Sequence, residues 1–231
     1  MRFVENPFFL LALTLGVYQL AKLLQHRTRS LLLNPILVSI ALLILFLKLT
    51  DVSFEAYQKA GGWIEFWLRP AVVALGVPLY LQLKIIRKQV LPILLSQLAG
   101  CVVGIVSVVS IARWLGASPH VLCSLAPKSV TTPIAMEVAQ SIGGIPSLTA
   151  AVVVCVGLFG GICGFKAMHA LKVHNPIAQG LSIGLASHAV GASAAMSISH
   201  RYGGYAGVGL ILNGILTAML TSPLLHLLGV L

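Results

Sequence analysis

The chain carries the stretch APKSVTTPIAMEVAQSIGG at residues 126–144 and a related stretch, ASHAVGASAAMSISHRYGG, at residues 186–204. Aligned without gaps, the two copies agree at six of nineteen positions, and both end in Gly-Gly. A basic side chain stands at the third position of each copy, Lys128 in the first and His188 in the second. Both copies are rich in polar residues and glycine, which interrupt helices. They therefore predict two related breaks in the structure.

The chain as a whole has the apolar composition of a membrane protein. Hydrophobic residues make up 58% of the 231 residues and charged residues 9%, whereas a soluble domain has roughly 25% charged residues. The sequence predicts an all-α integral membrane protein with about six transmembrane helices and two re-entrant or broken helical segments at 119–144 and 176–204. The six apolar runs are each close to the ~20 residues that a spanning helix needs: 3–21, 31–47, 63–83, 90–112, 148–165 and 207–228.

The net charge of +10 does not indicate a nucleic-acid-binding protein. The basic residues fall mainly in short loops between the apolar runs, and no basic stripe with interleaved aromatic residues occurs. The four cysteines lack the paired spacing of a zinc site, and no glycine-rich phosphate-binding loop is present. We therefore expect a protein surrounded by the lipid bilayer, with no nucleic-acid partner, metal or cofactor.

The loop charges bear on how the two broken segments meet the membrane. If both enter and return to the same side, nine Lys and Arg residues fall on one face and four on the other; if both cross, the count is seven against six. Because cytoplasmic loops are enriched in Lys and Arg, re-entry is favoured, with both termini outside. A single span separates the segments, so they would form an inverted repeat, as in secondary transporters. The lengths of the segments leave open a broken helix that crosses.

We expect one transmembrane domain, 1–231, with an N-terminal four-helix part at 1–115 and a core at 116–231 that holds both broken segments. Asn213 and Gln97 are expected to form hydrogen bonds between helices. Within the core, four glycines give one span a small-residue face that favours close helix packing: Gly157, Gly160, Gly161 and Gly164.

The first copy contains a helix start signal. Thr132 is predicted to cap a half-helix at residues 134–142, with Pro133 at its first position. The amino end of such a helix presents free backbone N–H groups and a partial positive charge, which suit a carboxylate. The side chains expected to bind a small carboxylate substrate from this copy are Lys128, Ser129, Thr131 and Thr132.

The second copy is predicted to break at residues 187–191. Gly191 relieves the backbone there, and Ser193 offers a hydroxyl. His188 is neutral or cationic near physiological pH, so it is a candidate both for binding substrate and for carrying a coupling proton. From this copy the substrate-binding residues are expected to be Ser187, His188, Gly191 and Ser193.

Glu137 is the acidic residue within the interrupted helices, and ionisable groups at this depth are costly unless they serve a purpose. One interpretation is proton coupling; the other is an internal ion pair with Lys128 or a neighbour. The adjacent pair Ser187-His188 does not predict a hydrolase, because neighbouring residues on a helix point apart and no acid partner is evident. We therefore expect no enzymatic activity.

Several motifs resemble those of the LrgB/CidB family of bacterial membrane proteins. The resemblance implies either a holin-like or antiholin-like role in murein hydrolase export and lysis, or transport of small carboxylates, as in the related plastid glycolate/glycerate translocator and bacterial pyruvate carriers. It also implies a small LrgA-type membrane protein as partner. The motifs cover nearly the whole chain: Asn34-Pro35-Ile36, residues 69–80, residues 128–150 and residues 187–195.

From these observations we expect a multi-pass protein of the bacterial inner membrane. The leading hypothesis is a secondary transporter of small monocarboxylates of the glycolate, pyruvate or 2-oxoacid kind, in which access alternates as an elevator-type unit moves. The alternative hypothesis is a holin-like pore component or regulator. Association into a homo-oligomer is left open.

Overall fold

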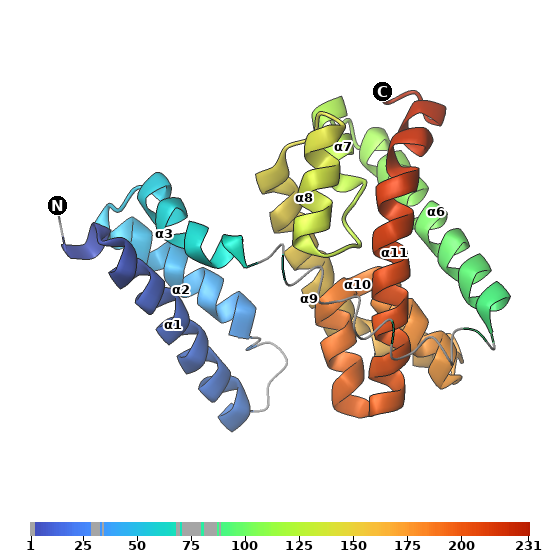
Figure 1. Cartoon of the computed structure of the whole chain (residues 1–231), viewed down its shortest axis with the longest axis horizontal. Coiled ribbons are helices and arrows are strands. Elements are labelled where there is room, and N and C mark those ends of the chain that lie inside the picture. Colours follow the sequence, from blue (N-terminus) through green and yellow to red (C-terminus); the bar gives the residue numbers. More distant parts are fainter. Residues whose placement is uncertain are drawn as a thin grey trace. The chain divides into compact units, whose positions relative to one another are not determined.

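The computed structural model describes residues 3–28, 33, 35–67, 70, 80, 87 and 89–231, and every regular element within them is helical (Figure 1). The chain divides into two compact units, Met1–Ala71 and Val72–Leu231. Most of the span expected at 63–83, and most of the family motif at 69–80, lies outside the described residues.

The first unit holds a small helical core. Leu10 of α1 packs there with Val52 and with Ala60 of α3. The hydroxyls of Thr14 and Tyr57 lie 3.0 Å apart and tie the same two helices together. The expected spans at 3–21 and 31–47 correspond to the first two helices of this unit, whose elements are η1 (Phe3–Glu5), α1 (Pro7–Thr28), α2 (Pro35–Thr50) and α3 (Phe54–Phe66).

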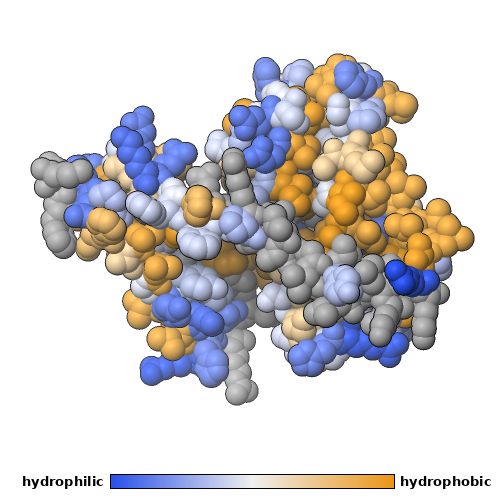
Figure 2. All heavy atoms as spheres, viewed as in Figure 1, coloured by the Kyte–Doolittle hydropathy of each residue, from blue (hydrophilic) through white to orange (hydrophobic). Residues whose placement is uncertain are grey.

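The second unit holds the longest helices. By length and apolar composition, five helices of the described residues are able to span a bilayer: α1, α6, α9, α10 and α11. A helix of 25 residues such as α9 rises about 37 Å, enough for a hydrocarbon core of about 30 Å. Apolar atoms cover much of this unit between polar atoms at its upper and lower ends (Figure 2). The chain is therefore a multi-pass membrane protein, as predicted. The elements of this unit are α6 (Val90–Trp114), α7 (Pro119–Leu125), α8 (Thr132–Ser141), α9 (Pro146–Ala170), α10 (Pro176–Ile198) and α11 (His200–Leu227).

The first broken segment forms a helical hairpin. Helices α7 and α8 are joined by the non-helical residues 126–131, which form the tip. His120 Nδ1 donates to the carbonyl oxygen of Gly143 at 2.8 Å, and Ser124 Oγ accepts from the backbone N–H of Ile145 at 2.7 Å. The start of α7 therefore lies beside the end of α8. We call residues 119–144 the first hairpin.

The second broken segment, α10, also folds back. Its backbone leaves the helical region at Ser187 (φ −131°, ψ 16°) and at His188 (φ 42°, ψ −136°). In an uninterrupted helix, residues 183 and 191 would be about 12 Å apart. Here a Cβ placed on Gly191 would lie 2.7 Å from the carbonyl oxygen of Ile183. The break predicted at 187–191 is thus confirmed, and residues 176–186 and 189–198 are the two arms of what we call the second hairpin.

The hairpins pack at opposite ends of α9. Near its amino end, Thr149 Oγ1 donates to the carbonyl of Ser124 in the first hairpin at 3.0 Å. Near its carboxyl end, Phe165 and Met168 pack against Ile183 of the second hairpin. Figure 1 shows α7 and α8 at the upper end of this unit and the turn from α10 to α11 at the lower end. The two copies are therefore inverted relative to each other in the fold; their re-entry into a bilayer stays a prediction.

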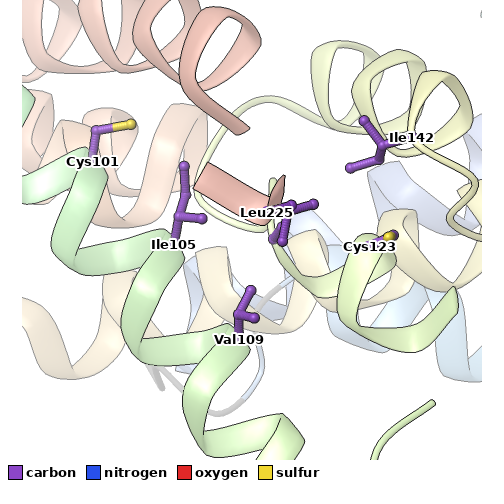
Figure 3. Packing of buried hydrophobic residues seen from close by; sticks show 7 residues of the cluster. Cys101, Ile105, Val109, Cys123, Ile142 and Leu225 are labelled. Atoms are coloured by element: carbon purple, nitrogen blue, oxygen red, sulfur yellow. The ribbon is translucent and has the colours of Figure 1, made fainter. Parts of the chain in front are cut away.

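A cluster of buried side chains holds the first hairpin against its neighbours. Figure 3 shows these residues converging on Leu225 of α11. Helix α6 contributes three of them, so it packs within the second unit, although the sequence placed it with the N-terminal part. The cluster consists of Cys101, Ile105, Val109, Cys123, Ala126, Ile142 and Leu225.

Candidate functional site

The tips of the two hairpins meet on the central part of α9. Val130, from the first tip, packs with Val153 in one buried cluster. His188, from the second tip, places Nε2 2.9 Å from the carbonyl oxygen of Val153, so the imidazole N–H donates to that carbonyl. A single residue of α9, Val153, therefore contacts both tips, the first through its side chain and the second through its carbonyl. This juxtaposition brings together segments that are 60 residues apart in the sequence.

One amide side chain on α11 joins the tips from the other side. Asn213 Nδ2 donates to the carbonyl of Ser129 at 3.1 Å and to the carbonyl of Leu185 at 2.9 Å. Thr217 Oγ1 donates to Asn213 Oδ1 at 3.4 Å, which orients the amide. Carbonyls next to a helix break lack their usual i+4 partner, and inside a membrane they need another donor. Asn213 supplies that donor to both hairpins at once.

His188 is 4% exposed and lies over a glycine. A Cβ on Gly157 would be 2.5 Å from Cε1 of the imidazole, so the ring occupies the space that a side chain on α9 would otherwise fill. A Cβ on Gly160 would likewise overlap the Ser187 hydroxyl. The close packing predicted for this glycine face is confirmed. In the present arrangement the imidazole Nε2 is engaged with α9.

Lys128 and Ser187 line one cavity of about 550 Å³. Lys128 is partly buried, and its Nζ donates to Ser129 Oγ at 3.1 Å. Each sequence copy thus contributes a polar side chain to the same space; that these side chains bind a substrate stays a prediction. The remaining wall is mostly apolar and comes from α9 and the first arm of the second hairpin; it includes Cys155, Phe159, Gly160, Cys163, Met168 and Ile183.

The helix start in the first hairpin differs by one residue from its prediction. Helix α8 begins at Thr132, its N-cap residue is Thr131, and neither position closes a side-chain capping bond. The Thr131 hydroxyl is buried and has no hydrogen-bond partner among the described residues. Leaving such a group unpaired costs about 1–3 kcal/mol. The Thr131 hydroxyl is therefore a buried polar group whose hydrogen-bonding capacity is unused among the described residues, and it does not line the cavity.

Three predicted residues lie elsewhere. Gly191 is buried against Ile183, where its lack of a side chain permits the fold-back. Ser193 is exposed on the second arm, and Glu137 is exposed on α8. None of these three lines the 550 Å³ cavity, and neither do Ser129, Thr131, Thr132 and His188, so of the predicted site residues Lys128 and Ser187 alone line it. Among the described residues, no three His, Cys, Asp or Glu side chains gather to hold a metal ion.

Sequence reasoning anticipated a hydrogen bond from Asn213 but not that one amide would serve both tips. It also missed the cavity wall formed by α9. The glycine spacing in α9 was the available signal, because a small-residue face needs a neighbour that fills it. The second hairpin fills this face of α9, because its chain folds back at Ser187 and His188.

Comparison with known proteins gives a consistent family assignment. The LrgB-like family matches residues 14–227. The uncharacterized protein YwbG of Bacillus subtilis is 37% identical over 207 residues, covering 90% of this chain and 92% of its own. The holin-like protein CidB of Staphylococcus epidermidis is 33% identical over 94% of this chain and 95% of its own. The antiholin-like protein LrgB of Bacillus mycoides is 30% identical over 97% and 98%. No solved structure matches the chain.

Proposed function

The chain belongs to the LrgB-like family, and from this premise we propose that it is a holin-like or antiholin-like component of the bacterial inner membrane, which controls passage across the bilayer. Its similarity to the holin-like protein CidB and the antiholin-like protein LrgB supports this proposal. Passage would occur where the two hairpin tips meet, because two broken helices leave a place inside the unit that can open without unfolding a complete span.

The observation that carries the proposal is the bridge from Asn213 to both tips. Two hydrogen bonds from one amide hold the tips together, so separating the hairpins breaks both. We propose a small LrgA-type membrane protein as the partner that biases this equilibrium. The protein thereby acts without enzymatic chemistry.

The test is lysis of bacterial cells that lack the chromosomal copy and express either the wild-type chain or Asn213→Leu. We expect the variant to change the rate of lysis and the release of murein hydrolase activity, because the tips separate more readily. Thr14→Val, which alters a hydroxyl in the first unit, is the matched control. Equal lysis with both variants and with the wild type, at equal membrane abundance, would contradict the proposal.

A second function is favoured by the cavity that Lys128 and Ser187 share. A cation and a hydroxyl from two inverted broken helices form the kind of site that secondary transporters use for carboxylates. In this alternative the chain carries small monocarboxylates of the glycolate, pyruvate or 2-oxoacid kind. Proton coupling through Glu137 or His188 is part of the same hypothesis.

Reconstituted vesicles distinguish the two functions. A carrier saturates with substrate concentration and shows counterflow, whereas a pore passes solute in proportion to the gradient. We expect labelled pyruvate or glycolate uptake to fall at least tenfold in Lys128→Ala and to persist in Lys166→Ala, a change at an exposed lysine of α9. Saturable uptake that is unaffected by Lys128→Ala or Thr132→Val would exclude these residues as the substrate-binding site.

A further inference from the structure

The 550 Å³ cavity is a groove that follows α9. Its lining residues on this helix run from Cys155 to Met168, a rise of about 20 Å. The first arm of the second hairpin and the adjoining Ser187 form the facing wall, since Ser187 lies against Gly160 and Ile183 against Gly164. The groove is therefore long and is bounded by two helical walls.

Charge is concentrated at one end of this groove. Among the described residues that line it, Lys128 is the one charged side chain. Lys128 belongs to the first tip, whose Val130 packs on Val153, so the cation lies at the Cys155 end. Toward Met168 the wall is formed by hydrocarbon, thioether and thiol groups, apart from the hydroxyls of Ser182 and Ser187.

We propose that this groove binds an amphipathic monocarboxylate, with its carboxylate at Lys128 and an alkyl chain lying along α9 toward Met168. The assignment rests on the carboxylate site proposed above and specifies its substrate class. The volume falls within the roughly 300–1,000 Å³ of pockets that enclose organic ligands, and an acid of two or three carbons fills only a small part of it. Beyond Lys128, Ser182 and Ser187 the walls offer few polar partners, so an alkyl chain fits the rest of the groove better than a chain of hydroxylated carbons.

The position of Lys128 along the helix axis favours a free acid over a membrane phospholipid as the ligand of the groove. Cys155, at the cationic end, lies nine residues from the start of α9, which is about 13 Å along the helix axis. Lipid headgroups reside at the interface, near the ends of spanning helices. A carboxylate without a bulky headgroup reaches the depth of the cation, whereas a phospholipid headgroup does not.

The test is a chain-length series of acids titrated against the full-length protein in lipid nanodiscs by calorimetry. Burial of each methylene contributes about 0.8 kcal/mol, which is about fourfold in affinity. We expect the dissociation constant to fall about threefold to fourfold for each added methylene from propionate to hexanoate. Octanamide, which lacks the charge, should bind at least tenfold more weakly than octanoate.

Three variants locate the site. Lys128→Met should abolish the preference for octanoate over octanamide, and Lys128→Arg should retain it. Ala167→Phe fills the groove and should weaken octanoate binding at least tenfold while leaving propionate binding unchanged. Ala151→Phe, at an exposed α9 position outside the groove, is the matched control.

The outcomes separate the two proposals. If propionate and octanoate bind with equal affinity, the proposal of an amphipathic ligand is wrong, but the proposal of a carboxylate site at Lys128 still holds. If acids of every length fail to bind, the carboxylate site is wrong as well. If octanoate and octanamide bind equally well to the wild type, the groove recognises hydrocarbon without the carboxylate, which also overturns the inference.

Discussion

The two hairpins share a sequence pattern but are held by different means. The second is in contact with α9 and α11 through glycines: a Cβ on Gly184 would overlap the backbone of Ala206, and a Cβ on Gly157 would meet His188. The first is anchored by larger side chains such as Ile142, and its tip is a stretch of six residues. Close contacts between a glycine and a neighbouring helix tolerate little displacement of the two helices, because the glycine has no flexible side chain that can adjust.

This difference divides the roles within the site. The second hairpin acts as a rigid wall whose polar tip is already bonded, since His188 donates to Val153. The first hairpin presents a partly buried cation, Lys128, and the buried hydroxyl of Thr131, which has no partner in the part of the chain that the structure describes. We infer that the first tip supplies most of the polar groups that bind a ligand. The second hairpin supplies the fixed surface against which the ligand packs.

The largest expected effect comes from breaking the rigid contact. Gly184→Ala places a Cβ on the backbone of Ala206, so we expect a loss of about 3 kcal/mol in the free energy of unfolding or failure to fold. Thermal unfolding of the purified protein measures the change. Gly104→Ala on α6 meets no atom of the described residues within 4 Å and should be neutral or slightly stabilising. Equal destabilisation of the two variants would show that the contact is not the cause.

Removing the bridge between the tips should have the next largest effect. Asn213→Leu deletes two hydrogen bonds and leaves the carbonyls of Ser129 and Leu185 without this donor. Interhelical bonds in membranes average about 0.6 kcal/mol and reach about 1.7, so we expect a loss of about 2 kcal/mol. Thr217→Val, which frees the amide to rotate and removes the 3.5 Å contact of Oγ1 with Cys101 Sγ, should cost less than half as much. An unfolding temperature unchanged in Asn213→Leu would exclude the bridge as a stabilising contact.

A smaller and more specific effect concerns the backbone at His188. Its φ of 42° is unfavourable for residues with a side chain and accessible to glycine. Both His188→Ala and His188→Gly lose the hydrogen bond to Val153, but only glycine relieves the backbone. We expect His188→Gly to be more stable than His188→Ala by about 1 kcal/mol in denaturant unfolding. The reverse order would show that the second tip adopts ordinary helical backbone.

The smallest effect on stability is expected at the first tip. Thr131→Val removes a buried hydroxyl with no partner among the described residues, so stability should stay within about 0.5 kcal/mol or rise. Ser124→Ala provides the contrast: Ser124 Oγ accepts from Ile145 N–H at 2.7 Å, and its loss should cost about 1 kcal/mol or more. Equal stability losses in the two variants would contradict this assignment.

Local sequence features predicted the breaks well. Polar and helix-breaking residues at 126–131 and 187–191 interrupt an apolar chain, and both interruptions occur in the structure. The capping residue was misplaced by one position, because Thr131 and Thr132 are chemically equivalent candidates for the same role. Adjacent threonines carry no local signal that selects between them.

The sequence by itself determined that this is a helical membrane protein with two related interruptions, because apolar run length and helix-breaking composition are local properties. Only the tertiary structure decided that Val153 and Asn213 join the two tips and that α9 forms one wall of a groove ending at Lys128. Those contacts depend on the direction in which the chain turns at Ser187 and His188. A backbone reversal of two residues sets the position of every side chain that follows it, and no periodicity in the sequence records its angle.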